Sequence, residues 1–246
     1  MLNSNGIEAY LVEKKFIGKN AIELCYRAEQ TLRYLPGQFY SVRFSHNKQD
    51  CSRSYSVVNK QLSPLENYEF RFVITLVEGG KASQYFLTTE LGSRVTLSGP
   101  YGSLVLPRID PKRYVMVATG AGVAPYRAMI PELTQRLNSN DDLEIVVLMG
   151  ARTKEELLYS DEFIAWANTN ARVKYLTIQS RVESPEDPKF TGHVQNLIPS
   201  LQLDPQNDMA YVCGNPQMVD QVVTLLGEKG FPVSSVKREK YLFSAF

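Results

Sequence analysis

Polar and apolar residues alternate through most of the first hundred positions of the chain. The alternating runs are rich in valine, isoleucine, tyrosine and phenylalanine and are separated by turn residues; they cover 9–18, 21–28, 38–44, 53–59, 68–77 and 94–99. A period of two is typical of strands that bury one face. We predict a small antiparallel β-barrel, because closure removes exposed sheet edges. One amphipathic segment, 81–92, predicts a helix that is capped by Gly92.

The pattern changes after a proline-rich, charged segment at 104–113, which suits a linker. Four nearly continuous apolar runs then alternate with amphipathic segments; the runs are 114–119, 143–150, 173–180 and 209–214, and the amphipathic segments are 125–137, 155–169 and 216–230. Strands that alternate with helices indicate a doubly wound parallel sheet. We therefore predict a β-barrel domain at 1–107 and an α/β nucleotide-binding domain at 108–246.

The first apolar run of the second domain leads into a glycine turn, "VATGAGVAPYRAMI". In a doubly wound sheet, a glycine-rich turn at this place lets backbone N–H groups approach a phosphate at the helix N-terminus. Gly120 and Gly122 stand in the turn, and Pro125 suits the first turn of the helix. The full GxGxxG fingerprint is absent, so the turn by itself leaves open a tight connection without a ligand.

Composition and charge exclude several classes of function. The net charge of +1 argues against nucleic acid or an anionic membrane as a partner, and no apolar run is long enough to span a bilayer. The N-terminus lacks a signal-peptide pattern, so we expect a cytoplasmic protein without membrane insertion. Three scattered cysteines and two histidines do not form a metal-site pattern. Redox chemistry in this chain would therefore need an organic cofactor.

Five short motifs follow one another along the chain: "RSYS" at Arg53–Ser56, "GGKAS" at Gly79–Ser83, "GPYG" at Gly99–Gly102, "GAGVAP" at Gly120–Pro125 and "CGNPQM" at Cys213–Met218. In this order and at these intervals they resemble the ferredoxin–NADP reductase family of flavoproteins, above all its bacterial ferredoxin and flavodoxin reductases. The resemblance covers nearly the whole chain. It implies an FAD enzyme that moves a hydride between NADP(H) and flavin, and single electrons between flavin and ferredoxin or flavodoxin. We expect a monomer.

The resemblance assigns the first motif to FAD. A guanidinium fork such as that of Arg53 can pair with the pyrophosphate, and the Tyr55 ring can lie flat on the flavin. Strand alternation puts Ser54 and Ser56 on the opposite face, so Ser56 reaches the flavin only if the strand bends or ends there. In the family, the matching serine lies near the reactive flavin nitrogen.

A second anion-binding segment is expected where the short helix begins. The amides of Lys81, Ala82 and Ser83 and the Lys81 charge suit the other side of the pyrophosphate, while the alternative is that Ser83 only caps the helix. Two such segments favour FAD over FMN. Phe72 falls where the family passes the FAD adenosine, although a core position is the main alternative.

The last two motifs belong to the nicotinamide side. The resemblance implies that the Cys213 thiol helps to place the nicotinamide ring and that Asn215, Pro216 and Gln217 begin a helix beside the dinucleotide; Met218 is expected to pack in the core. Where the family usually has a threonine that contacts the flavin region, this chain has Ala121, and the neighbouring Thr119 is the candidate to replace it.

Two arginines at strand ends favour NADP(H). Ser180 and Arg181 resemble the family's pair for the 2′-phosphate, and Arg152 ends the preceding strand at a matching place. Two guanidinium groups that converge without an anion would repel each other. His193 stands where some relatives have a third basic residue, and Lys189 is its candidate substitute. The alternative is that both arginines are solvated surface charges.

The C-terminal segment "VKREKYLFSAF" carries aromatic residues that a frayed tail would expose to water, so we expect them to pack against another group. By the resemblance, Tyr241 stacks on the flavin, Glu239 lies near the nicotinamide, and Phe243 or Phe246 covers the adenine; Ser56, Cys213, Glu239 and Tyr241 form the catalytic set. The alternative is a last strand of the sheet. For the whole chain, the alternatives are a reductase component of an oxygenase, a free-flavin reductase, or a non-catalytic nucleotide-sensing or assembly subunit.

Overall fold

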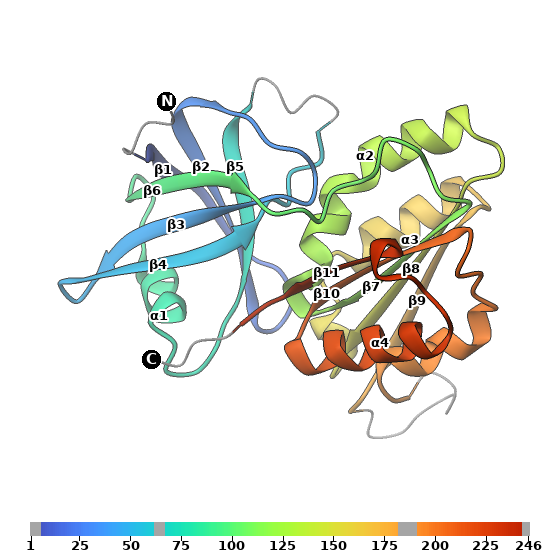
Figure 1. Cartoon of the computed structure of the whole chain (residues 1–246). Helices are drawn as coiled ribbons and strands as arrows, with labels where there is room; N and C mark the ends of the chain where they lie inside the picture. The colour runs from blue at the N-terminus through green and yellow to red at the C-terminus, as the bar shows by residue number, and fades with distance from the viewer. Residues whose placement is uncertain (1–5, 62–66, 182–190, 243–246) are drawn as a thin grey trace. The chain divides into compact units, whose positions relative to one another are not determined.

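The structure of the protein is a computed structural model, drawn in Figure 1, which describes residues 6–61, 67–181 and 191–242. Its residues fall into two compact units. We call Met1–Leu106 with Ala124–Pro131 and Phe243–Phe246 the barrel unit, and Pro107–Val123 with Glu132–Leu242 the sheet unit.

The barrel unit is built on a six-stranded antiparallel sheet, as the alternating pattern predicts. Its strands lie in the order β4-β3-β6-β1-β2-β5, so that β4 and β5 are the two edges. The strands are β1 (Ile7–Phe16), β2 (Ala21–Leu32), β3 (Phe39–His46), β4 (Gln49–Ser56), β5 (Asn67–Thr75) and β6 (Arg94–Tyr101). The sheet curls into an open barrel (Figure 1). Helix α1 (Lys81–Thr88) lies between β5 and β6 in the chain.

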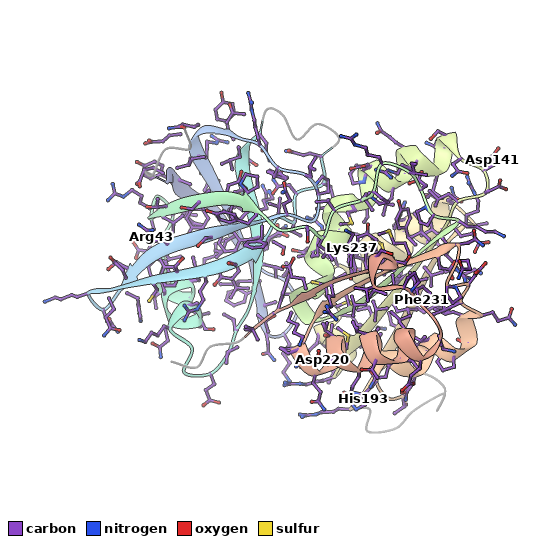
Figure 2. The ribbon with its side chains drawn as sticks, in the orientation of Figure 1. Arg43, Asp141, His193, Asp220, Phe231 and Lys237 are labelled. Atoms are coloured by element: carbon purple, nitrogen blue, oxygen red, sulfur yellow. The ribbon has the colours of Figure 1, made fainter. Side chains whose placement is uncertain are left out.

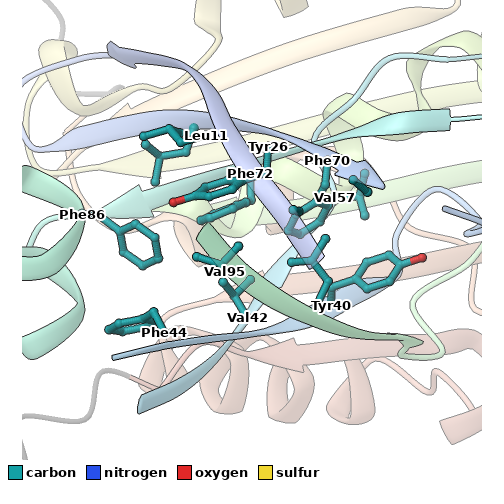
Figure 3. Packing of buried hydrophobic residues seen from close by; sticks show 14 of the residues in the cluster. Leu11, Tyr26, Tyr40, Val42, Phe44, Val57, Phe70, Phe72, Phe86 and Val95 are labelled. Atoms are coloured by element: carbon teal, nitrogen blue, oxygen red, sulfur yellow. The ribbon is translucent and has the colours of Figure 1, made fainter. Parts of the chain in front are cut away.

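Aromatic rings fill the inside of this barrel (Figure 3). Phe72 of β5 lies between Tyr26 of β2, at 5.7 Å between ring centroids, and Tyr55 of β4, at 4.7 Å, in nearly parallel stacks. Phe86 of α1 meets the edges of Phe72 and Tyr55. The two edge strands therefore meet through their rings, and each fully buried ring stabilises the barrel by about 1.5–3 kcal/mol.

The expected cap of α1 is wrong. The helix ends at Thr88, and Thr89 is already extended while its N–H donates to the Tyr85 carbonyl. Gly92 instead has a left-handed φ of +84° in the turn that leads into β6, and its N–H donates to the Leu11 carbonyl at 2.8 Å. Its conformational freedom serves the turn against β1, because only glycine adopts this backbone without strain.

The sheet unit is doubly wound, as predicted. Five parallel strands lie in the order β11-β10-β7-β8-β9, so the first strand in the chain, β7, is central. The strands are β7 (Arg113–Thr119), β8 (Glu144–Ala151), β9 (Val173–Gln179), β10 (Asp208–Gly214) and β11 (Val236–Lys240), and the helices are α2 (Ala124–Ser139), α3 (Ser160–Thr169) and α4 (Pro216–Glu228). A 3₁₀ segment, η4 (Val194–Leu201), precedes β10. Within the described residues, no helix is both long and apolar enough to cross a membrane.

Two elements differ from the sequence-based expectation. Helix α3 begins at Ser160 and not near 155, because Tyr159 takes a left-handed conformation with φ of 58°. The C-terminal segment forms β11 over Val236–Lys240, paired in parallel with β10. The alternative of a last strand is therefore correct up to Lys240, and Tyr241 follows it. Phe243 and Phe246 lie outside the described residues.

Buried valines, leucines and isoleucines from the sheet, η4 and α4 form the core of the sheet unit. Phe231, which follows α4 (Figure 2), joins this core, and its N–H donates to the Leu226 carbonyl. The strands of this unit therefore end on a rigid base, which fixes the loops that follow β7, β8, β9 and β10.

Candidate functional site

The sheet unit changes strand order beside β7, which places a ligand crevice outside the carboxyl ends of β7 and β10. The loops after these two strands approach each other very closely. A Cβ on Gly122 would lie 2.2 Å from the Cys213 carbonyl oxygen, and one on Gly214 would lie 2.6 Å from the Thr119 carbonyl oxygen. Both glycines are therefore required for the approach.

The glycine turn itself is a short 3₁₀ segment, η1 (Gly120–Val123), that runs directly into α2. Gly120 is left-handed with φ of +54°, and Pro125 stands in the first turn of α2, as predicted. No side chain caps α2, and the turn stands at the positive end of the helix dipole, where an anion is favoured. This arrangement suits the phosphates of a dinucleotide.

Thr119, the candidate to replace the threonine that is missing at Ala121, is the last residue of β7. Its hydroxyl oxygen accepts a hydrogen bond from the Asn215 N–H at 3.1 Å, which ties the end of β7 to the loop after β10. A hydroxyl that accepts one hydrogen bond can still donate another. Ala121 is buried, and the role of Thr119 beside it stays a prediction.

Three of the predicted catalytic residues meet at the end of β10. Cys213 is paired with Glu239 across the parallel ladder, and the Tyr241 N–H donates to the Gly214 carbonyl at 2.8 Å. The Tyr241 hydroxyl donates a hydrogen bond to the Cys213 sulfur. Burial raises the pKa of the Cys213 thiol well above its usual range, the Glu239 charge raises it further, and the bond from Tyr241 acts against both. The thiol is therefore neutral and covered, and it is no nucleophile.

The helix after β10 is held by the "GNPQ" segment. Asn215 is the N-cap of α4, and its side-chain oxygen accepts from the N–H groups of Gln217, at 2.9 Å, and Met218, at 3.3 Å. Pro216 stands at the first helical position, and Gln217 is exposed. Met218 is buried in the core, as predicted. Asn215 thus shapes the loop, and only Gln217 offers a free polar side chain to solvent.

Arg152 and Arg181 are neighbours at the ends of β8 and β9. The Arg181 N–H donates to the Arg152 carbonyl at 2.8 Å, and the Ser180 N–H donates to the Ala151 carbonyl at 3.0 Å. Both arginine side chains are exposed, and in the part of the chain that the structure describes neither guanidinium forms an ion pair. Exposed His193 caps η4 (Figure 2), and Lys189 lies outside the described residues. Two unpaired guanidinium groups on adjacent strand ends can hold a dianion.

In the barrel unit, alternation along β4 separates the residues of "RSYS". Arg53 and Tyr55 share the face of Cys51, which is buried in the core, while exposed Ser54 points to the other face. Tyr55 packs one ring face on Phe72, which has no exposed surface and so supports Tyr55 from the core. Ser56 is buried and is the last residue of β4, so the strand ends where the sequence argument requires.

The start of α1 adds positive charge to the same face of β4. The Lys81 ammonium donates to the Gln49 side chain at 3.0 Å, and Gln49 lies four residues before Arg53 on the same strand. The N-cap is Gly80, without a side-chain cap, so the alternative of Ser83 as the cap is wrong. The Ser83 oxygen accepts from the Val77 N–H at 2.8 Å and closes the preceding turn.

These donors fit the FAD pyrophosphate. Arg53 supplies a guanidinium, Lys81 an ammonium, and α1 uncapped amides at its positive end, including that of Ala82. Tyr55 adds a ring whose second face is not used by Phe72. The structure thus brings Arg53, Tyr55 and Lys81 to one side of the barrel unit and leaves the Ser54 side chain on the other.

Comparison with known proteins identifies two domains in the chain. A model described as the oxidoreductase FAD-binding domain matches residues 8–106, and one described as the oxidoreductase NAD-binding domain matches residues 116–224. The chain is 30% identical over 250 residues to ferredoxin–NADP reductase B of Sorangium cellulosum, covering 98% of this chain and 100% of that protein. It is 26% identical to the phenol hydroxylase P5 protein of Acinetobacter pittii, over 97% of this chain and 66% of that one.

Solved structures share the fold. A ferredoxin NADP+ reductase from Neisseria gonorrhoeae with bound FAD and NADP matches with a TM-score of 0.80 and 22% identity, over 95% of this chain and 97% of that one. The Amycolatopsis cytochrome P450 reductase GcoB matches with a TM-score of 0.83 and 21% identity, over 98% of this chain and 70% of that one. The protein is an oxidoreductase with an FAD-binding and a NAD(P)-binding domain. On its sequence, its fold and its motifs, the chain belongs to the ferredoxin–NADP reductase family.

Proposed function

We propose that the protein is an NADPH-dependent ferredoxin or flavodoxin reductase. FAD, when bound, supplies the conversion between a two-electron hydride and single electrons. The polypeptide supplies position, exclusion of water and local charge. The relative that the chain matches over its full length, the Sorangium protein, is named a ferredoxin–NADP reductase. This supports a small electron-carrier protein as the partner.

The observation that carries the choice of NADPH is the pair Arg152 and Arg181. Their backbones are joined by a hydrogen bond of 2.8 Å, and their exposed side chains have no ion-pair partner among the described residues. Two guanidinium groups that start from neighbouring backbones can converge on one anion, which offsets their mutual repulsion. The 2′-phosphate distinguishes NADPH from NADH and supplies that anion, and Ser180 adds a hydroxyl at the same strand end.

The test is the double variant Arg152→Ala with Arg181→Ala. Loss of two charge-assisted contacts should lower kcat/KM for NADPH by at least about 100-fold, or about 2.7 kcal/mol, and leave kcat/KM for NADH within about threefold. Asp141→Ala, on an exposed turn of the same unit, is the matched control for a surface charge. An unchanged preference for NADPH over NADH in the double variant would contradict the assignment.

Around the nicotinamide, the residues at the end of β10 act by position. The Cys213 thiol is buried and its pKa is raised well above its usual range, so it stays neutral and no covalent step through it is needed. We infer that the nicotinamide ring replaces the Tyr241 ring above Cys213, with Glu239 beside it, and that Ser56 serves from the flavin side. Tyr241 would then gate access to the site.

A second candidate is the reductase component of an oxygenase. Its support is the 26% identity to the phenol hydroxylase P5 protein and to the toluate 1,2-dioxygenase electron transfer component of Pseudomonas putida, of which the chain covers 66% and 69%. Turnover separates the two candidates. Reduced flavodoxin or ferredoxin should form rapidly with NADPH in the first case, whereas in the second the electrons should reach only the electron acceptor of an oxygenase.

A further inference from the structure

A buried carboxylate lies outside the residues assigned to either cofactor. Glu23 is in β2, and its side chain is 1% exposed. The neighbouring residues at this end of β2, 21–26, are buried as well, on both faces of the strand. A carboxylate removed from water is stable only with partners.

Glu23 has three cationic neighbours from three different elements. Lys15 of β1 lies at 3.0 Å, Arg71 of β5 at 3.4 Å and Arg127 of α2 at 3.9 Å. Arg71 is shared with two other carboxylates, Glu13 at 2.7 Å and Glu69 at 3.5 Å. Arg127 is the most buried of the three cations, with 12% of its side chain exposed.

Arg127 also holds the segment that follows the flavin motif. Its guanidinium donates to the Val58 carbonyl at 2.7 Å, and the Val58 N–H donates to the Arg71 carbonyl at 2.9 Å. Val58 comes two residues after Ser56. In the chain, Arg127 stands in the first turns of α2, five residues after Gly122. The Arg127 side chain therefore links α2, the helix that follows the glycine turn, to the backbone just after "RSYS".

We propose that Glu23 is a positioning residue, which acts through Arg127 to fix the first turns of α2 against the segment after Ser56. The two segments joined this way are those assigned to the flavin and to the dinucleotide. Hydride transfer requires its reacting atoms within about 3–3.5 Å, and an error of about 1 Å can cost 100-fold in rate. The proposal rests on the family's hydride transfer and on NADPH as donor, but not on the identity of the carrier protein.

The experiment compares three variants of the FAD-loaded protein. Glu23→Gln keeps the shape of the side chain and removes its charge, Arg127→Met removes the guanidinium, and Lys15→Met is the matched control that takes a cation from the same carboxylate without contact to α2. The rate of flavin reduction by saturating NADPH should fall about tenfold in Glu23→Gln and about 100-fold in Arg127→Met. It should stay within twofold of wild type in Lys15→Met, and the Kd for NADP+ should stay within about threefold throughout.

Hydrogen exchange gives the readout that does not depend on activity. Amides of residues 124–131 should exchange at least about tenfold faster in Glu23→Gln and Arg127→Met, and at the wild-type rate in Lys15→Met. If the Arg127→Met protein loses FAD, the Glu23→Gln variant alone tests the proposal. A Glu23→Gln protein with full FAD, wild-type exchange in 124–131 and a wild-type reduction rate would overturn the proposal. An equal fall in the reduction rate of the Lys15→Met protein would also overturn the proposal, since it would show that Glu23 acts only on the stability of the protein. Failure of wild-type protein to be reduced by NADPH would instead count against the proposed function.

Discussion

Gly122→Ala is the sharpest perturbation of the dinucleotide site, because it adds one methyl group where two backbones meet. The new Cβ would lie 2.2 Å from the Cys213 oxygen, 2.5 Å from the Cys213 carbonyl carbon and 2.7 Å from the Gly214 Cα. All three atoms belong to backbone, so no side chain can move aside. The glycine turn and the end of β10 must separate by at least about 0.8 Å to reach even a tight contact of 3.0 Å.

The cost follows from this displacement. Overpacking of this kind destabilises by about 1–3 kcal/mol, and we expect a value near the upper end because the clash is with backbone. For a chain of this size that lowers Tm by about 5–10 °C. The first amides of α2 move with the turn, so the Kd for NADP+ should rise at least tenfold, or about 1.4 kcal/mol.

Gly227→Ala is the matched control in the same unit. Gly227 stands near the end of α4, and a Cβ there would meet nothing within 4 Å. The same substitution should stabilise the protein by about 0.5–1 kcal/mol through helix propensity and leave NADP+ binding unchanged. Urea unfolding and isothermal titration with NADP+ measure both quantities. A Gly122→Ala protein with wild-type stability and wild-type NADP+ affinity would refute the reasoning.

Three further predictions rest on other parts of the site. Released cofactor should run as FAD on chromatography, because Arg53 and the start of α1 offer more anion-binding donors than one terminal phosphate needs; FMN would contradict this. Tyr241→Ser should tighten nicotinamide binding about tenfold by uncovering Cys213. Deletion of residues 242–246 should weaken FAD retention. Unchanged nucleotide and FAD affinities in these two variants would show that the tail has only a structural role. Burial raises the pKa of Cys25 to about 12 and that of Cys213 well above its usual range, so neither of these two thiols should react quickly with Ellman's reagent at pH 8. Between about pH 9 and 12 these two thiols release protons in the unfolded chain and keep them in the folded protein, so the free energy of unfolding should fall as pH rises. A fast-reacting Cys25 or Cys213 in the native protein would refute this.

Local pattern predicts most of the strands. Short runs, several of them alternating with a period of two, predict the strands of the barrel unit, and continuous apolar runs predict β7 to β10, because burial on one face or on both imposes these patterns directly. β11 was only an alternative: "VKREK" is charged, and its strand state depends on pairing with β10, which no local signal reports.

The site can be predicted less completely from the sequence, since contacts between residues far apart in the chain determine where its side chains lie. Gly120, Gly122 and Pro125 could be placed from the turn alone. The hydrogen bond from Asn215 to Thr119 joins residues that are 96 positions apart, so no local pattern could predict it. Glu23 follows the alternating pattern of β2 as a solvent-facing residue, and no local signal reports that it is buried beside cations from β1, β5 and α2.

Anaerobic titration of the purified protein with NADPH tests the central claim most directly. We predict a yellow protein with about one FAD per chain, whose visible absorbance is bleached by one equivalent of NADPH and much more slowly by NADH. We also predict that oxidised flavodoxin or ferredoxin then restores the yellow colour. A colourless protein that takes up no flavin, or a flavin that NADPH fails to reduce, would contradict the claim that this chain is an NADPH-dependent flavoprotein reductase.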